Sequence, residues 1–179
     1  KIVNERLQKM KTLVHPNIAS VISVHSDEDF TFMVAEDYPE TNLDQYIVST
    51  VKLSENEVLR ISKSLFDAFT YMHSKDVFHG GLTLENILFD SEMNPIISNF
   101  AFCQHKLAAI RTRETNELNF IPPEIHTETS FDPFASDIWA LGIIVYVMVS
   151  GKLPFDQKNQ IKQISQIVEC KYTIPFIVN

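Results

Sequence analysis

Residues 79–88 read HGGLTLENIL. A short apolar run, Ile87–Phe89, ends this stretch, and a second one, Ile96-Ile97, follows. The stretch from Asp90 to Pro95 between the two apolar runs consists largely of turn-forming residue types. This pattern predicts a small hairpin that is entered through an irregular loop with two adjacent glycines. A glycine costs roughly 0.5–1 kcal/mol of backbone entropy relative to alanine in a regular element, and a loop tolerates that cost.

The segment upstream of this loop, Leu53–Ser74, has a strong helical pattern. Ser54 and Glu57 have the spacing of a capping box at its start. Apolar residues then recur at steps of three and four, as one buried helix face requires. These residues are Val58, Ile61, Leu65, Phe69 and Met72.

The first forty residues predict a short helix followed by a hairpin. Ile2–Val14 has helical spacing, and the helix stops at His15 because the following proline disfavours helical geometry there. Ala19–Val24 and Phe30–Glu36 are typical of two strands joined by a polar turn.

The second half of the chain is predicted to be mainly helical. Phe102–Ile121 has no clear period and is expected to be a long loop, of the kind that is often functional. A buried helix is predicted over Phe134–Ser150, with Gly151 at its end, and one more helix over Gln157–Cys170. A small strand-and-helix part followed by a helical part excludes the regular alternation of a parallel α/β sheet.

The composition narrows the class of protein. A formal net charge of −8 over 179 residues argues against nucleic acid or anionic membrane as a partner, because both need clustered Lys and Arg.

The apolar run Ile138–Val149 is short for a membrane span, and no secretory signal is visible. Cys103 and Cys170 show no pairing pattern, so we expect a cytoplasmic or nuclear protein that is not secreted. Because Lys1 opens inside a predicted helix, we expect the chain to be part of a longer one.

Six segments, taken in order, resemble the landmarks of eukaryotic protein kinase domains. Residues 79–88 are similar to the catalytic loop His-Arg-Asp-Leu-Lys-Pro-Glu-Asn-Ile-Leu, and Asn99-Phe100-Ala101 stands where the family has Asp-Phe-Gly. One such motif is a weak signal, but all of them in register over essentially the whole chain are a strong one. The other matching segments are His15-Pro16-Asn17-Ile18, Phe32-Met33-Val34-Ala35-Glu36, Pro122-Pro123-Glu124 and Asp137-Ile138-Trp139-Ala140-Leu141-Gly142; residues 149–155 and 172–175 resemble the calmodulin-dependent and AMP-activated group of serine/threonine kinases.

The resemblance implies an α+β, protein-kinase-like bilobal fold in truncated form. Residues 1–36 would form part of the small lobe, with helix C and strands 4 and 5. Residues 37–42 would form the hinge. Residues 43–179 would form the large lobe, incomplete at its C-terminal helices.

The resemblance places the catalytic positions at His79, Gly80, Gly81 and Thr83, and leaves none of them with an intact catalytic group. Gly81 replaces the Asp that accepts the substrate proton, and Thr83 replaces the Lys that steadies the transferred phosphoryl group. Gly80 replaces an Arg that pairs with a phosphorylated activation loop in many kinases. We expect His79 to be a packed residue of an apolar spine and not a base.

The metal-binding positions implied by the resemblance are Asn86 and Asn99. Asn99 replaces an Asp, and magnesium prefers carboxylate oxygen. For Asn86 we expect a polar cap beside the loop, with residual metal or nucleotide contact as the alternative. Asn86→Ala is then expected to shift stability by no more than about 0.5 kcal/mol.

Glu36, Tyr38 and Leu88 fall in the adenine and hinge region. ATP and Mg²⁺ are the implied cofactors, and we expect their binding to be weak or absent.

Four further residues are given structural roles by the resemblance. Asp137 is expected to be a buried carboxylate that accepts backbone hydrogen bonds from the catalytic loop. Glu124 pairs with a later Arg in the family, and that Arg would lie beyond this chain. Phe100 belongs to the apolar spine, and Trp139 to the start of the buried large-lobe helix.

These observations leave three functional hypotheses. The first is a catalytically inactive pseudokinase that binds or regulates other proteins as a scaffold. The alternative is an active but atypical serine/threonine kinase that transfers phosphate from ATP. A further alternative is a truncated fragment without independent function. Gly81 and Asn99 separate the first two, and the natural length of the chain separates the third.

Overall fold

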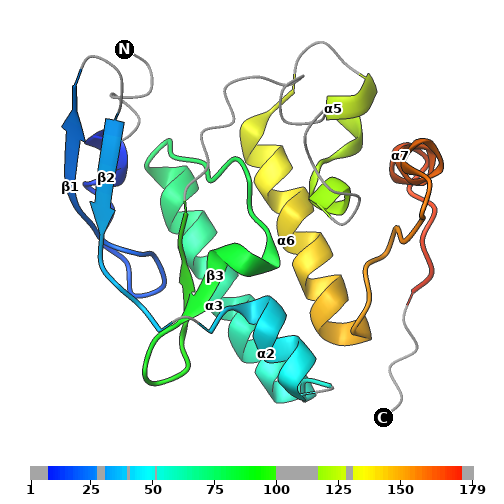
Figure 1. The fold of residues 1–179 in the computed structure, drawn as a ribbon, viewed down its shortest axis with the longest axis horizontal. Helices are drawn as coiled ribbons and strands as arrows, with labels where there is room; N and C mark the ends of the chain where they lie inside the picture. Colours follow the sequence, from blue (N-terminus) through cyan, green and yellow to red (C-terminus); the bar gives the residue numbers. More distant parts are fainter. Residues whose placement is uncertain are drawn as a thin grey trace.

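The structure, a computed structural model, describes residues 8–27, 31–39, 41–50, 52–99, 117–127 and 131–174. Strands β1 (Val21–Ser26) and β2 (Thr31–Ala35) lie at one side of the molecule. Helix α7 (Gln160–Val168) lies at the other side, and α3 (Glu55–Ser74) and α6 (Pro133–Ser150) run between them (Figure 1). Strands β1 and β2 are thus separated from α6 and α7, as expected for an α+β chain.

Strands β1 and β2 form an antiparallel pair, with Val24 opposite Met33 and Ser26 opposite Thr31. The register shifts at a bulge between Val21 and Ser23. Val24 and Met33 pack against the core, whereas Phe32 on the adjacent position is exposed. The predicted hairpin is confirmed, with β1 beginning and ending two residues later than the pattern indicated.

A second antiparallel pair is formed by β3 (Ile87–Phe89) and β4 (Pro95–Ile97). This confirms the small hairpin predicted after the glycine-containing loop. The N-terminal part of the chain joins it, because the Ala19 N–H donates to the Ile97 carbonyl at 2.9 Å and the Ile97 N–H donates to the Asn17 carbonyl at 2.9 Å. These bonds connect the part of the chain that carries β1 and β2 to the residues that follow the loop.

Helix α3 confirms the strongest prediction from periodicity. The Ser54 side chain accepts a hydrogen bond from the Glu57 N–H, and the Glu57 side chain accepts one from the Ser54 N–H, so the capping box is present. The buried face of the helix consists of Ile61, Leu65, Ala68, Phe69 and Met72.

Helix α2 (Leu43–Thr50) was not predicted. Its start is held by reciprocal hydrogen bonds, in which Gln45 N–H donates to Asn42 Oδ1 at 3.0 Å and Asn42 N–H donates to Gln45 Oε1 at 3.1 Å. Leu43 and Ile47 are buried. The spacing from Asn42 to Gln45 is that of a capping box and could have revealed this helix.

Helix α6 is the central helix of the large helical part. Asp132 caps its start by accepting from the Phe134 N–H, and Gly151 ends it in the left-handed conformation at φ 69°. By length and composition alone the helix could cross a membrane, but one side packs in the core, in part against α3. The prediction of a buried helix is correct for that side only, because Ile138 is 50% exposed. The buried positions are Asp137, Ala140, Leu141, Ile143, Ile144, Val147 and Met148.

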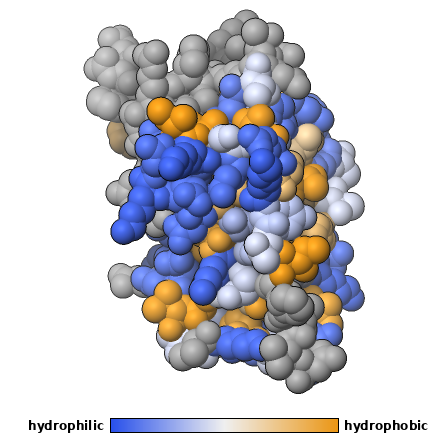
Figure 2. All heavy atoms as spheres, turned by 90° about the vertical axis from the view of Figure 1, so that its right-hand side faces the viewer, coloured by the Kyte–Doolittle hydropathy of each residue, from blue (hydrophilic) through white to orange (hydrophobic). Residues whose placement is uncertain are grey.

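The remaining elements lie beside α6. They are the 3-10 helix η2 (Glu117–Phe120), the short helix α5 (Pro123–Thr127) and α7. Helix α7 is shorter than the predicted Gln157–Cys170, because the Asn159 side chain caps it by accepting from the Lys162 N–H. The face on the α7 side is mostly hydrophilic, with separate apolar patches (Figure 2).

Two predictions fall wholly or partly outside the described residues. Residues 2–7 of the predicted N-terminal helix lie outside the described part, although residues 8–10 are helical. Of the predicted long loop, residues 102–116 lie outside the described part, and residues 117–120 form η2.

The capping box of α3 predicts a specific dependence of stability on pH. The Ser54 hydroxyl, then the Tyr46 hydroxyl and the Ser54 N–H, lower the pKa of Glu57 from 4.5 to about 2. Since the folded-state pKa is depressed, the stabilisation is complete above pH 4.5 and is lost as the pH falls toward 2. Glu57→Gln removes this titration, so the free energy of unfolding should fall less steeply over that window, as measured by urea unfolding at a series of pH values.

Glu55→Gln, at an exposed position in the same turn, is the matched control and should keep the parent slope. Equal slopes for all three proteins would contradict this prediction.

Candidate functional site

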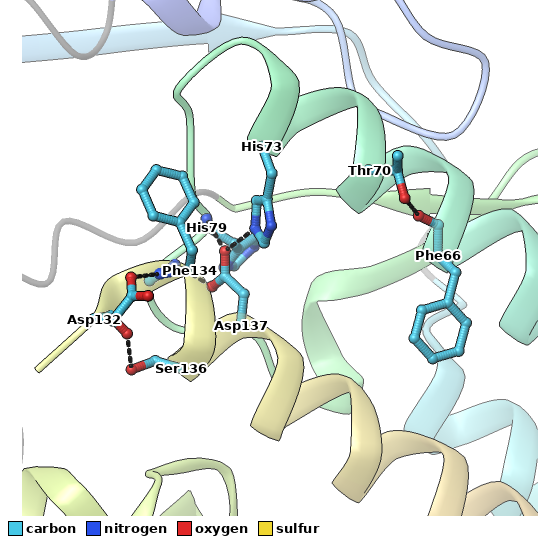
Figure 3. A network of polar contacts seen from close by, with 9 residues as sticks. Phe66, Thr70, His73, His79, Asp132, Phe134, Ser136 and Asp137 are labelled. Carbon is cyan, nitrogen blue, oxygen red and sulfur yellow. Dashed lines mark hydrogen bonds and ion pairs between the residues drawn. The ribbon is translucent and has the colours of Figure 1, made fainter.

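The loop that contains residues 79–86 is held by one carboxylate from α6. Asp137 is 1% exposed, and its Oδ2 accepts the His79 N–H at 2.8 Å while its Oδ1 accepts the Gly80 N–H at 2.9 Å. Figure 3 shows this carboxylate directed from α6 toward the loop. Two successive backbone groups are therefore fixed by one side chain that comes from more than fifty residues away.

His73, at the end of α3, is a third partner of this carboxylate. Its Nε2 lies 3.0 Å from Asp137 Oδ2 (Figure 3). The imidazole also packs edge-on against Phe134, with ring centroids 5.0 Å apart. The sequence analysis did not identify His73, because a single histidine near a helix end carries no pattern. Together these contacts join α3, the loop and the first turns of α6.

The His79 ring is buried and used structurally. The residue is 0% exposed, and its Nε2 lies 3.0 Å from the Ser98 carbonyl oxygen. A carbonyl oxygen only accepts, so Nε2 carries the proton of this hydrogen bond. That nitrogen cannot accept a substrate proton.

The two glycines leave the next part of the loop without side chains. Gly80 has φ 79°, a left-handed conformation that favours glycine over other residues. Gly81 does not share this constraint, because its φ is not positive. Both residues are half-buried. Gly81, which the resemblance places at the proton acceptor, thus offers no side-chain functional group.

Thr83 and Asn86 form a closed pair. Asn86 Oδ1 accepts both the Thr83 N–H at 3.2 Å and the Thr83 hydroxyl at 3.1 Å. The Asn86 main-chain oxygen accepts from the Ser98 N–H and from the Ser98 hydroxyl, at 2.8 and 3.0 Å. Asn86 is 9% exposed. An amide oxygen has two lone pairs, and here Thr83 uses both of them.

This geometry supports the polar-cap interpretation of Asn86 and changes the expected effect of its removal. From the sequence alone, Asn86→Ala is expected to shift stability by no more than about 0.5 kcal/mol. Because the side chain is buried and its loss leaves the Thr83 N–H without its acceptor, we now expect a cost of about 1–2 kcal/mol.

Asn99 lies in a different environment. It is exposed and has φ 52°, a left-handed conformation in which asparagine is enriched among non-glycine residues. No group of three or more His, Cys, Asp or Glu side chains within the described part of the chain could hold a metal ion.

Comparison with known proteins decides the family. The model of the protein kinase domain family matches residues 1–177. The chain belongs to the protein kinase family. The kinase domain is 35% identical over 161 residues to CBL-interacting serine/threonine-protein kinase 17 of Arabidopsis thaliana, covering 88% of this chain and 37% of that protein.

Other relatives have the same character. CBL-interacting protein kinase 21 of Oryza sativa subsp. japonica is 33% identical over 178 residues, or 97% of this chain and 34% of that protein. Serine/threonine-protein kinase SIK1 of Mus musculus is 31% identical over 180 residues, or 100% of this chain and 23% of that protein. The chain therefore spans less than two-fifths of the length of these relatives. The predicted resemblance and the kinase-like α+β fold are both confirmed.

The magnesium ions that the kinase family implies do not fit the residues present. Magnesium takes oxygen ligands, preferably carboxylates. At the two metal positions Asn99 supplies a neutral amide, and the amide oxygen of Asn86 already accepts two hydrogen bonds from Thr83. Gly81 supplies no side chain. No catalytic step through a metal is therefore derived for this domain.

Two of the three residues that the resemblance assigns to the adenine and hinge region are linked to one another. The Tyr38 hydroxyl donates to Glu36 Oε2 at 2.9 Å. Burial, and then this hydrogen bond, raise the pKa of Tyr38 to about 12. The Glu36 N–H donates to the Ser20 carbonyl at 2.9 Å. Leu88 is half-buried in β3 and pairs with Asn42 just before α2. The structure thus brings Leu88 to Asn42, whereas Glu36 and Tyr38 bond to each other and Glu36 bonds to Ser20, just before β1.

Trp139 belongs to a buried polar cluster that sequence reasoning missed. Its indole N–H donates to the Asn119 carbonyl at 2.8 Å, and its ring stacks on Phe155 with centroids 6.0 Å apart. Asn119 is 0% exposed; its Oδ1 accepts the Phe155 N–H at 3.0 Å and its Nδ2 donates to the Phe155 carbonyl at 3.2 Å. Gln163 Nε2 also donates to that carbonyl, at 2.8 Å. The cluster joins η2, α6 and α7.

Two further residues were given structural roles by the resemblance. Within the described residues, Glu124 of α5 takes part in no ion pair. Phe100 lies outside the described residues.

Proposed function

We propose that this kinase domain is catalytically inactive and acts as a protein-binding or regulatory module. The observation that carries the proposal is the Thr83–Asn86 pair, in which the amide oxygen at a metal position already accepts two hydrogen bonds. This closed pair sits beside Gly81, which has no side chain to accept a proton.

The replaced groups would all have acted on the same chemical step. Phosphoryl transfer depends on positioning and on charge neutralisation by metal ions, a lysine and a base. Loss of general base catalysis alone lowers a rate roughly 10²–10⁴-fold. In this domain the lysine position is Thr83 and one metal position is Asn99, so several charges are missing together.

The framework around the loop supports a binding role. Asp137 still fixes the loop backbone, and the core around α3 and α6 is closely packed. Such a scaffold presents a defined surface without chemistry. The net charge of −8 favours other proteins as partners over nucleic acid or an anionic membrane, and we propose a cytoplasmic or nuclear location.

We expect no protein phosphotransfer from this domain. The whole protein that contains it is incubated with labelled ATP, magnesium or manganese, and generic protein substrates. Because the base, the lysine and a metal-binding carboxylate are all replaced, turnover should stay well below about 1 s⁻¹, the lower end for ordinary kinases. Asn86→Ala serves as the control for a contaminating kinase. Turnover above that rate which Asn86→Ala abolishes would support the active-kinase alternative and refute the proposal.

Magnesium-dependent nucleotide binding by the 179-residue chain should be weak or absent. A ligand at 100 times its dissociation constant adds about 2.7 kcal/mol of stability, which a thermal melt detects readily. With millimolar Mg-ATP we expect no rise in melting temperature beyond that with magnesium alone. A clear rise with Mg-ATP that disappears in EDTA would contradict this expectation.

A further inference from the structure

A cavity of about 110 Å³ lies against the glycine pair. Its described walls come from the loop that contains Gly80 and Gly81, from η2 and the residues after it, from α5 and from the first turns of α6. Because neither glycine has a side chain, nothing projects from that part of the loop into this space. The cavity therefore occurs where the family's motif carries an arginine and an aspartate.

The described walls are mainly apolar. Phe78, Phe120 and Phe131 contribute three aromatic rings, and Ile121 and Ile125 contribute branched aliphatic side chains. No Lys, Arg or His is among the described lining residues. These described walls thus lack the positive charge that a phosphate or carboxylate ligand needs.

The polar side chains in the described walls already have partners. Asp137 accepts hydrogen bonds from two loop N–H groups and lies 3.0 Å from His73 Nε2. The Ser136 hydroxyl donates to the Asp132 carbonyl at 3.1 Å (Figure 3). A polar ligand would have to compete with these bonds, whereas an apolar ligand would leave them in place.

The size of the cavity indicates the size of its ligand. An engineered apolar cavity of about 150 Å³ in another protein stays dry and binds benzene. A volume of about 110 Å³ is of the same order, and it suits one ring better than two fused rings.

We propose that this cavity is a binding site for a small uncharged apolar molecule the size of a single aromatic ring. The inference does not depend on the proposed loss of phosphotransfer. A ligand here would contact both the loop and α6, and would stabilise the loop in the conformation that Asp137 holds.

The direct test is methyl NMR on the whole protein with labelled isoleucine methyl groups. Benzene and toluene are titrated as probes, and naphthalene serves as the two-ring comparison. Saturable shifts are expected at Ile121 and Ile125 with the single-ring probes and not with naphthalene. Ile161 and Ile174, which are 79% and 75% exposed, are the internal controls. Absence of saturation at Ile121 and Ile125, or equal shifts at the exposed controls, would overturn the proposal.

A substitution at the cavity wall gives an independent test. Ala140 lines the cavity and is 2% exposed, so Ala140→Leu should weaken benzene binding at least tenfold by filling the space. Ala135→Leu makes the same change at an exposed position on the same helix that does not line the cavity, and it should bind as the parent does. If Ala140→Leu fails to fold, the isoleucine shifts of the parent protein still decide the question. Equal affinity for a folded Ala140→Leu variant and the parent would refute this location of the site.

Discussion

Replacing Asp137 with Ala is expected to lower the free energy of unfolding by about 2–6 kcal/mol. The substitution leaves the N–H groups of His79 and Gly80 buried without their acceptor, and each unsatisfied group costs about 1–3 kcal/mol. A domain of this kind is stable by only about 5–15 kcal/mol. Urea unfolding of the 179-residue chain, followed by the fluorescence of its single tryptophan, measures the loss.

The controls for this prediction use the same helix and the same loop. Asp132→Ala changes the same residue type to the same product five positions earlier, at an exposed helix cap, and should cost about 0.5–2 kcal/mol. Asn86→Ala should be intermediate, at about 1–2 kcal/mol. Asp137→Asn keeps the shape of the side chain but replaces one acceptor oxygen with a donor, so it should be nearly as damaging as Asp137→Ala. If Asp132→Ala or Asn86→Ala proves more damaging, the loop is not held mainly by Asp137.

Removing the Asn119 side chain is expected to produce the second large loss of stability. Asn119→Ala leaves the buried Phe155 N–H without its acceptor and opens space beside it, for a cost of about 1–3 kcal/mol or slightly more. The Phe155 carbonyl retains the hydrogen bond from Gln163, which limits the damage. The midpoint and slope of urea unfolding measure the change.

A matched control for Asn119 is available on α3. Asn56 is exposed, so Asn56→Ala should stay within about 0.5 kcal/mol of the parent. Asn119→Asp tests the same geometry differently, because it would place a carboxylate oxygen against the Phe155 carbonyl; it should be at least as destabilising as Asn119→Ala. Similar unfolding curves for Asn119→Ala and Asn56→Ala would show that the buried cluster contributes little.

The elements that could be predicted are those with local signals. Helix α3 follows from the three- and four-residue spacing of its apolar face and from Ser54 and Glu57, which bind each other within one turn. The end of α6 follows from Gly151, whose φ of 69° is a conformation that glycine adopts more readily than other residues. Helix α2 was missed although Asn42 and Gln45 carry a comparable signal, because its apolar stripe is short.

The candidate site could likewise be predicted only in part. The family and the missing charges follow from residue identities at fixed spacing, since Gly81, Thr83 and Asn99 lack the required groups in any conformation. The exact use of Asn86 did not follow, because one side chain at that spacing can cap a turn or bind a ligand. Only the observed hydrogen bonds from Thr83 distinguish these two uses.

By itself, the sequence determined which chemical groups this kinase domain possesses and where several of its helices begin and end. Both depend on the residues themselves and on neighbours within a few positions. The tertiary structure decided those pairings of distant polar groups that no motif predicts. His73 meets Asp137 across 64 residues, and Asn119 meets Phe155 across 36. The tertiary structure also determined that a cavity lies beside Gly80 and Gly81. Such contacts depend on how helices pack in three dimensions, and no local pattern of residues encodes them.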